Sequence, residues 1–295
     1  MNRVEAHDEL TPLVVSNVYV SDHSKKVLEY MKEHVGDESF VMSTFRDVEY
    51  NRASMCISGT PKAVVSSVLK VVAAALEKVD YSKHSGTHPA IGAVDHVNVH
   101  PLRPSKDLKI AVEVAESIAK RLASDLKIPV YLYGAAHPQG KGLAKGRREL
   151  GYFKSHKCGT LKKKAELKVM PDAGPRNNDP KKGVAMVGAC PWVMNYNIPV
   201  TCESLSQAQI LCDKIREAKG GLKGVQAMAL KNENGIEVAC NLLAIEEIGP
   251  EDVYQKLKIE CEKLGRGTEM KAPYVIGRFP QDVLSETIAA LQAKE

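Results

Sequence analysis

The segment of residues 84–89 carries the side chains best suited to chemistry, because it places two histidines beside a glycine and a proline. Its sequence is HSGTHP, so His84 and His88 lie four positions apart. A helix would bring both imidazoles to one face as metal ligands, but Gly86 and Pro89 disfavour a helix. No glutamate follows the first histidine, as it does in zinc proteases. We expect no metal here, and two interpretations stay open: a loop histidine that moves a proton near neutral pH, or a structural one.

A second candidate group surrounds position 50. Asp47 and the pair Asn51 and Arg52 flank the junction of two expected strands. They form either a structural turn or a site in which a carboxylate orients a partner and an arginine binds a substrate carboxylate.

The other histidines and the cysteines are expected to be structural. His96, His100 and His137 stand at the ends of expected strands. The seven cysteines include no CxxC pair, which indicates reduced thiols in a cytosol-like compartment. Residues 1–10 lack the apolar core of a signal peptide, so we expect a cytoplasmic protein.

Composition and charge exclude several classes of protein. The 295 residues are 44% hydrophobic and 26% charged, which is typical of a globular chain, and no apolar run is long enough to span a membrane. The net charge of +5 is concentrated in residues 141–164 and 181–182. This basic stretch is either a solvated face or a site for a polycarboxylate or phosphate. With four Phe and one Trp and no nucleic-acid module, a nucleic-acid partner is not expected.

Strands and helices that alternate along the chain must position these residues. In the first half we expect strands at 13–20, 40–45, 53–58, 93–100 and 129–133, and helices at 24–35, 60–76 and 105–126. In the second half we expect strands at 191–200, 225–230, 236–243 and 274–276, and helices at 204–218, 250–264 and 281–291. Each half contains the ferredoxin-like order βαββαβ. The sequence therefore predicts an α+β fold of two α/β subdomains, 1–190 and 191–295, with sheets covered by helices and a ligand groove between them.

Several segments in this frame resemble one known family. KHSGTHPAIGAVDHV, residues 83–97, is similar to the formiminotransferase signature around its catalytic histidine, approximately K-H-x-G-x-H-P-R-x-G-A-x-D. Further matches in the same order are the Asn-Arg pair after the second strand and the V-Y-L-Y-G strand at 130–134. The P-D-x-G-P loop and the G-x-x-x-x-G strand entry after it match within 170–188, and the N-x-N of Asn195 and Asn197 follows. Together they extend from about residue 13 to residue 290.

The resemblance implies an activity. It implies transfer of a formimino group from N-formiminoglutamate to N5 of tetrahydrofolate, by a homodimer whose folate groove lies between the two subdomains. His88 matches the catalytic histidine, which is proposed to move the N5 proton. The positions implied to contact substrate are Asp47, Asn51, Arg52, His84, Tyr133, Asp172 and the loop Gly174, Pro175, Arg176, Asn177, Asn178, Asp179, Pro180, Lys181, Lys182 and Gly183.

Two departures from the family pattern keep other functions open. Ala90 stands where the family has arginine, and Thr87 where it has an acidic residue. One alternative is a folate-binding protein without transferase activity, or one that uses a different one-carbon donor such as a formyl compound. Another is a scaffold that binds proteins through its basic surface.

Overall fold

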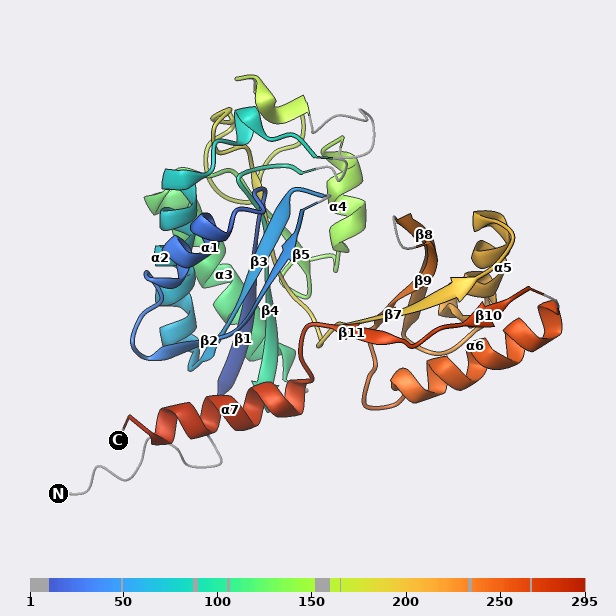
Figure 1. Cartoon of the computed structure of the whole chain (residues 1–295). Helices are drawn as coiled ribbons and strands as arrows, with labels where there is room; N and C mark the ends of the chain where they lie inside the picture. The colour runs from blue at the N-terminus through green and yellow to red at the C-terminus, as the bar shows by residue number, and fades with distance from the viewer. Residues whose placement is uncertain are drawn as a thin grey trace. The chain divides into compact units, whose positions relative to one another are not determined.

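The chain forms two mixed α/β units, each with its own sheet and core, which confirms the predicted α+β class (Figure 1). The computed structural model describes residues 11–48, 50–86, 90–104, 107–151, 160–164, 166–232, 235–265 and 267–294. Residues up to Cys190 together with those from Gln281 make up unit 1, and Pro191–Pro280 make up unit 2.

Unit 1 is built on a sheet of six strands in the order β2-β3-β1-β4-β6-β5. The strands are β1 (Leu13–Val20), β2 (Ser39–Asp47), β3 (Arg52–Gly59), β4 (Val94–Arg103), β5 (Val130–Gly134) and β6 (Ala185–Ala189). The first four pair antiparallel in the ferredoxin-like order, and β6 and β5 extend the sheet by parallel pairing beside β4. Strand β6 was not among the strands expected from the residue pattern, although the resemblance included a strand entry at 183–188.

Three helices cover one face of this sheet: α1 (Lys25–Lys32), α2 (Pro61–Lys78) and α3 (Leu108–Asp125). Helix α2 begins after Thr60, whose hydroxyl accepts from the N–H of Ala63 at 3.4 Å, and Pro61 occupies its first turn. Its valines at helical spacing, Val64, Val68 and Val72, are fully buried against the strands. The other face packs α4 (Leu143–Glu149) and the short turn η2 (Thr160–Lys162) around a smaller cluster, whereas Tyr81 of the short turn η1 (Tyr81–Lys83) is buried in the main core.

The last helix, α7 (Pro280–Gln292), belongs largely to unit 1, although the sequence predicted it within a second subdomain ending at 295. It crosses the end of the unit 1 sheet (Figure 1). There the hydroxyl of Thr287 lies 2.6 Å from that of Ser58 on β3, and neither residue is exposed to solvent. This buried polar contact, together with the apolar packing of the helix, explains why the final segment returns to the first unit.

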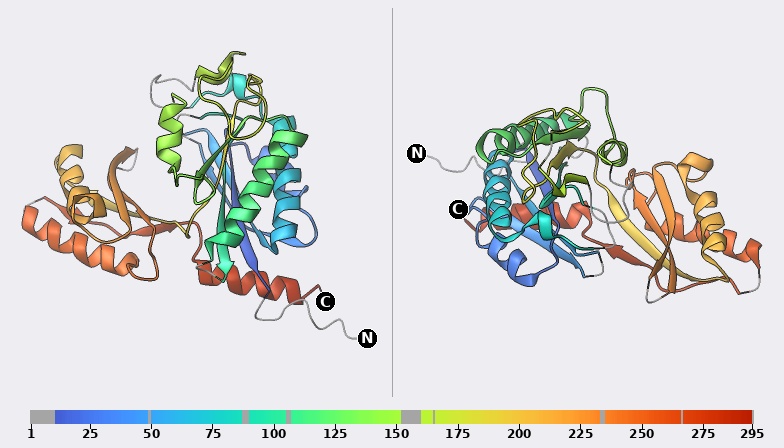
Figure 2. Two further views of the ribbon diagram at one scale, coloured as in Figure 1. Left: turned by 180° about the vertical axis from the view of Figure 1, so that it is seen from behind. Right: turned by 90° about the horizontal axis from the view of Figure 1, so that it is seen from above.

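Unit 2 reproduces the predicted βαββαβ order. Its elements are β7 (Met194–Thr201), α5 (Leu205–Ile215), η3 (Glu217–Lys219), β8 (Val225–Asn232), β9 (Gly235–Leu242), α6 (Pro250–Leu264), β10 (Glu269–Met270) and β11 (Tyr274–Ile276). The strands lie in the order β10-β7-β9-β8, and β11 also pairs with β7. Helices α5 and α6 cover the same face of this sheet (Figure 2) and bury Leu211, Val238 and Leu257 between the layers. Across the described ranges, no helix is long and apolar enough to cross a membrane.

Candidate functional site

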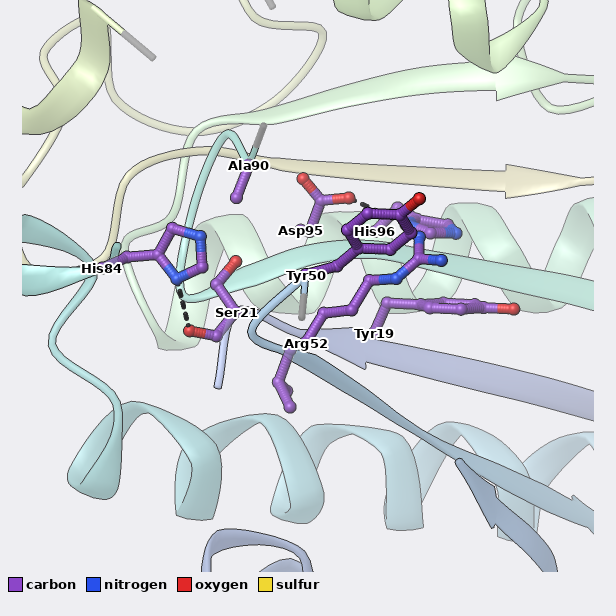
Figure 3. A pocket seen from close by; sticks show the side chains of 9 residues that line it. Tyr19, Ser21, Tyr50, Arg52, His84, Ala90, Asp95 and His96 are labelled. Atoms are coloured by element: carbon purple, nitrogen blue, oxygen red, sulfur yellow. Dashed lines mark hydrogen bonds and ion pairs between the residues drawn. The ribbon is translucent and has the colours of Figure 1, made fainter. Parts of the chain in front are cut away.

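A pocket in unit 1 brings together segments that are far apart in the sequence (Figure 3). Its cavity volume is about 20 Å³, which is room for about one water molecule and is far below the roughly 300–1,000 Å³ of small-molecule sites. Its lining comes from the end of β1, the start of β3, the segment after η1, and the start of β4. The lining residues are Tyr19, Val20, Ser21, Tyr50, Arg52, His84, Ala90, Asp95 and His96.

The alternation of side chains along the strands determines which residues reach this pocket. On β1, Val18 and Val20 point into the core under the helices, so Tyr19 points to the opposite face. On β4, Val97 lies in the same core and His96 on the opposite face. The register places Tyr19 directly across from His96, and their rings stack with centroids 3.9 Å apart. A polar, aromatic patch therefore forms on the sheet face that α1–α3 leave uncovered.

His84 is held in one orientation at the edge of the pocket. His84 directly follows η1. The turn begins after Asp80, whose carboxylate accepts from the N–H of Ser82 at 3.1 Å. The Nδ1 atom of His84 lies 2.8 Å from the carbonyl oxygen of Ser21, and only 5% of the residue is exposed. Burial lowers the pKa of His84, and the nearby ammonium of Lys162 lowers it further. Its Nε2 atom is buried and has no hydrogen-bond partner in the described part of the chain.

Asn51 links three segments behind this histidine. It takes a left-handed backbone conformation with φ of 49°, which asparagine tolerates better than most residues. Its side-chain oxygen accepts from the backbone N–H of His23 at 3.2 Å, and its amide nitrogen donates to the carbonyl of Ser85 at 2.8 Å. Asn51 therefore holds the loop that carries His84 through the backbone of Ser85, and its amide nitrogen also lies 3.4 Å from Nδ1 of His84.

Arg52 lines the pocket, whereas Asp47 lies next to it. A guanidinium nitrogen of Arg52 is 3.7 Å from the carboxylate of Asp47, and the guanidinium carbon lies 5.1 Å from the centroid of the Tyr50 ring. The arginine side chain is 34% exposed, so it is still accessible to an anion. The pair fits a turn and an anion site equally well.

Asp95 and His96 of the pocket lining form a buried charged cluster with Arg147, and the residue pattern alone did not indicate that this cluster is functional. Asp95 accepts from the N–H of Ile91 at 3.0 Å and forms an ion pair with Arg147 of α4, whose Nη2 lies 2.9 Å from Nδ1 of His96. Although burial opposes it, the charge of Arg147 holds the pKa of Asp95 well below its usual range. Burial, reinforced by Arg147, lowers the pKa of His96 to about 4, so this imidazole is neutral at pH 7. The aspartate of the G-A-x-D pattern was an available signal, but nothing in the sequence connects it to Arg147.

Ala90 lies in the wall of the pocket, where the family pattern has an arginine. It is 5% exposed, and its carbonyl accepts from the hydroxyl of Tyr81 at 2.8 Å. The following turn is fixed by Ser21, whose hydroxyl donates to the carbonyl of Gly92 at 2.7 Å. A Cβ atom at Gly92 would lie 2.2 Å from the carbonyl oxygen of Val184, so the close approach of these backbones requires glycine.

The loop that the resemblance assigns to folate lies in unit 1, and none of its residues lines this pocket in the described structure. Asp172 accepts from the N–H of Leu132 at 2.7 Å, buried Asn178 donates to the carbonyl of Lys163 at 3.1 Å, and Lys182 donates to the carbonyl of Leu126 at 2.8 Å. These contacts fasten the loop to β5, to the segment after η2 and to the end of α3. These side chains therefore have partners within the protein, whereas the resemblance had implied that they contact substrate.

Other positions that the resemblance assigned to substrate are either buried or accessible to solvent. Tyr133 on β5 is 4% exposed, and burial raises its pKa well above the usual value. The carboxylate of Asp179 accepts from the N–H of Lys181 at 2.9 Å. The positions of this loop that are exposed or half-exposed are Asp172, Gly174, Pro175, Arg176, Asn177, Asp179, Pro180, Lys181 and Lys182. Gly183 is buried.

His88, together with Thr87, lies outside the described residues, so its role as acid–base catalyst stays a prediction. What the described pocket offers is a buried neutral imidazole, a partly exposed guanidinium and paired charges. These groups can bind and orient a polar substrate and exchange a proton with it. Within the described ranges, no three His, Cys, Asp or Glu side chains are grouped so that they could hold a metal ion.

Comparison with known proteins gives one consistent family. Residues 13–190 match the formiminotransferase domain, N-terminal subdomain. The formiminotransferase cyclodeaminase-like protein of Arabidopsis thaliana is 36% identical over 84% of this chain and 86% of that protein. The glutamate formimidoyltransferase of Streptococcus pyogenes serotype M1 is 29% identical over 81% of this chain and 78% of that protein. The formimidoyltransferase-cyclodeaminase of Gallus gallus is 34% identical over 72% of this chain but only 40% of its own length. The chain belongs to the formiminotransferase domain family.

Proposed function

We propose that this protein is a folate-dependent one-carbon transferase. It moves a formimino or formyl group from an N-formiminoglutamate-like donor to N5 of tetrahydrofolate. The observation that supports this most directly is the pocket of unit 1, which brings Arg52 of one family motif together with His84 and Ala90 of another, all within residues 13–190. Two relatives are named glutamate formimidoyltransferases, and this chain aligns with more than two thirds of each.

The reaction needs one proton removed and one delivered. The amine at N5 attacks the one-carbon unit and forms a new C–N bond while it loses its proton. The bond from that carbon to the glutamate nitrogen then breaks, and this nitrogen gains a proton and leaves as an amine. We assign both transfers to His88, two positions before Ala90 of the pocket wall. Arg52 is suited to a carboxylate of the glutamate part because its guanidinium is partly exposed beside the pocket.

The test combines turnover with binding. Formimino transfer from N-formiminoglutamate to tetrahydrofolate should be measured with the wild type and with His88→Ala, and the variant should lose it. In parallel, the melting temperature should be recorded with saturating tetrahydrofolate, because a ligand that binds only the folded state raises it. Transfer that is unchanged in His88→Ala would remove this residue from the mechanism.

A second candidate function is folate binding without transfer, and Ala90 favours it. The pocket wall lacks the arginine of the family pattern at this position, and the neighbouring Arg147 is paired with Asp95. A melting shift with tetrahydrofolate but no transfer from any formimino or formyl donor would support this function. A shift seen only in Ala90→Arg would mean that the natural ligand is a different molecule, and no shift in either protein would exclude folate.

The resemblance also leads us to propose a homodimer in the cytoplasm. Light scattering after size-exclusion chromatography tests the dimer directly, and a monomeric mass at micromolar concentration would contradict it.

A further inference from the structure

His23 is part of none of the matched sequence motifs, yet it contacts the residue that holds the loop after η1. It is half-buried in the segment 21–24, which connects β1 to α1. Its Nδ1 atom lies 2.7 Å from the side-chain oxygen of Asn51, to which its backbone N–H also donates at 3.2 Å. Nε of Arg46 on β2 donates to the carbonyl of His23 at 2.6 Å. The backbone of His23 is therefore held on both sides, and its ring directs one nitrogen at Asn51.

Two backbone groups fix the orientation of the Asn51 amide. The backbone N–H of His23 can only donate, so the side-chain atom of Asn51 that faces it is the oxygen. The carbonyl of Ser85 can only accept, so the atom 2.8 Å from it is the amide nitrogen. Because Nδ1 of His23 also faces the amide oxygen, it must carry a proton. His23 is thus a hydrogen-bond donor to Asn51.

The turn that contains Asn51 holds two consecutive positions of the loop after η1. The amide nitrogen of Asn51 donates to the carbonyl of Ser85. Gly86 lies directly against the same turn, because a Cβ atom at Gly86 would be 2.7 Å from the carbonyl oxygen of Tyr50 and 3.2 Å from Cβ of Asn51. With φ of 49°, Asn51 has a backbone conformation that costs free energy and persists where the surroundings fix it. His23 is one of the residues that fix it.

We propose that His23 is a positioning residue for the transfer reaction: through Asn51 it fixes residues 84–86, from which the chain leads directly to His88. This inference rests on the proposed function and adds a residue to it. An acid–base group must lie within about 2.6–3.2 Å of the atom with which it exchanges a proton, and a misplacement of about 1 Å can cost about 100-fold in rate. A residue that holds the preceding backbone therefore affects turnover without touching the substrate.

The test separates positioning from stability. His23→Ala removes the donor to Asn51, whereas His23→Asn retains an amide N–H near the position of Nδ1. Asn51→Gly removes the side chain that His23 bonds and still allows a positive φ. His34→Ala is the control, because Nδ1 of His34 also lies 2.8 Å from an oxygen, but this is the carbonyl of Tyr30 in α1. For these variants and the double variant of positions 23 and 51, kcat and KM for formimino transfer and the melting temperature are measured.

We expect His23→Ala to lower kcat about 10-fold, with KM for the donor and for tetrahydrofolate within about twofold of the wild type. His23→Asn should recover most of this loss, and His34→Ala should keep the wild-type kcat. The melting temperature should fall by a similar small amount in His23→Ala and His34→Ala, since each loses one hydrogen bond. Because His23 acts through Asn51, the double variant should lose no more than Asn51→Gly alone, within about twofold.

Three kinetic results would overturn the inference. An unchanged kcat in His23→Ala, or an equal loss in His23→Asn, would mean that the donor at Nδ1 does not matter for turnover. Multiplied losses in the double variant would mean that His23 acts by another route than Asn51. A higher KM at constant kcat would mean that His23 contacts a substrate.

Hydrogen exchange tests the same contact without turnover. Amide exchange in a peptide that contains residues 84–92 should be faster in His23→Ala than in the wild type and should return to the wild-type rate in His23→Asn, while exchange in α7 stays the same. If the wild type transfers no one-carbon group, the transferase is excluded, and the exchange alone then decides whether His23 holds the loop. Exchange at 84–92 that is unaltered in His23→Ala would overturn the inference whatever the turnover.

Discussion

Replacement of Asp95 by alanine is the perturbation with the largest expected effect on unit 1. The Asp95 side chain is 12% exposed and that of Arg147 is 13% exposed, so their ion pair is largely shielded from water. The same carboxylate accepts from the N–H of Ile91 at 3.0 Å and so fixes the turn that carries Ala90. Asp95→Ala removes both contacts and leaves the guanidinium in its buried position.

The magnitude follows from the burial. Removal of one partner from a buried ion pair costs about 3–5 kcal/mol, because the other charge loses its compensation in a medium of low dielectric constant. For a folding unit of this size, 1 kcal/mol corresponds to about 2–4 °C in melting temperature. We expect Asp95→Ala to lower the free energy of unfolding by about 4 kcal/mol and the melting temperature by about 8–16 °C.

A double-mutant cycle separates the ion pair from the other contacts. Urea unfolding followed by circular dichroism should be measured for Asp95→Ala, Arg147→Met and the double variant. The double variant should be more stable than the sum of the single effects predicts, by at least about 1.5 kcal/mol, because it contains neither buried charge alone. Asp95→Asn, which keeps an acceptor for Ile91, should lose less than the alanine variant. Additivity within about 0.5 kcal/mol, or a loss below about 1 kcal/mol in Asp95→Ala, would refute the reasoning.

Three further measurements test other features. Because burial lowers the pKa of His96 from 6.5 to about 4, the unfolded chain binds a proton at a higher pH than the folded protein does, and the free energy of unfolding should fall by about 3 kcal/mol as the pH drops from about 6.5 to 4. Urea unfolding at several pH values should show a weaker pH dependence in His96→Gln than in the wild type, and an unaltered pH dependence would contradict this cause. At Gly183, φ is +68° and a Cβ atom would lie 2.4 Å from a backbone carbonyl oxygen, whereas at Gly140 φ is +63° and the space is open. Gly183→Ala should therefore lower the melting temperature much more than Gly140→Ala, and equal losses would mean that only backbone strain matters. Thr287→Val should lower the free energy of unfolding in urea by about 1–3 kcal/mol, because it leaves the buried hydroxyl of Ser58 with an apolar neighbour. The additional substitution Ser58→Ala should restore part of this loss, whereas a further loss would exclude the contact as the cause.

Much of the fold could be predicted because its signals are local. Apolar residues at helical spacing on α2 and alternating side chains on β1 and β4 specify element type without reference to the rest of the chain. The residue pattern did not reveal strand β6, because its short sequence of small residues follows a polar loop and pairs only between β4 and β5, and only the resemblance included its entry. Helix α4 was missed because it is mostly polar and contains Gly146, whose missing side chain admits Met186. Such packing is a tertiary effect.

Residues of the site could likewise be predicted where their signal is local and not where it depends on tertiary packing. His84 and Arg52 could be found because they stand in compact motifs, and the structure places both at one pocket. Arg147 could not be found, since more than fifty positions separate it from Asp95 and only the sheet brings them together. The sequence also gave no means to separate substrate contacts from structural ones in the 172–183 loop. Asp172 binds a backbone N–H within β5 and Lys182 binds a backbone carbonyl at the end of α3, and such pairings depend on the folded neighbourhood.

The return of α7 to unit 1 has a consequence for how the protein folds during its synthesis. A ribosome releases the chain from the N-terminus, so all of unit 2 emerges before the segment that closes the end of the unit 1 sheet. Until then, the Ser58 hydroxyl on β3 lacks its Thr287 partner and this end of the sheet stays uncovered. Nascent unit 1 is thus exposed to chaperones and proteases for the time needed to translate residues 191–294, and a premature stop after unit 2 would leave that end permanently open.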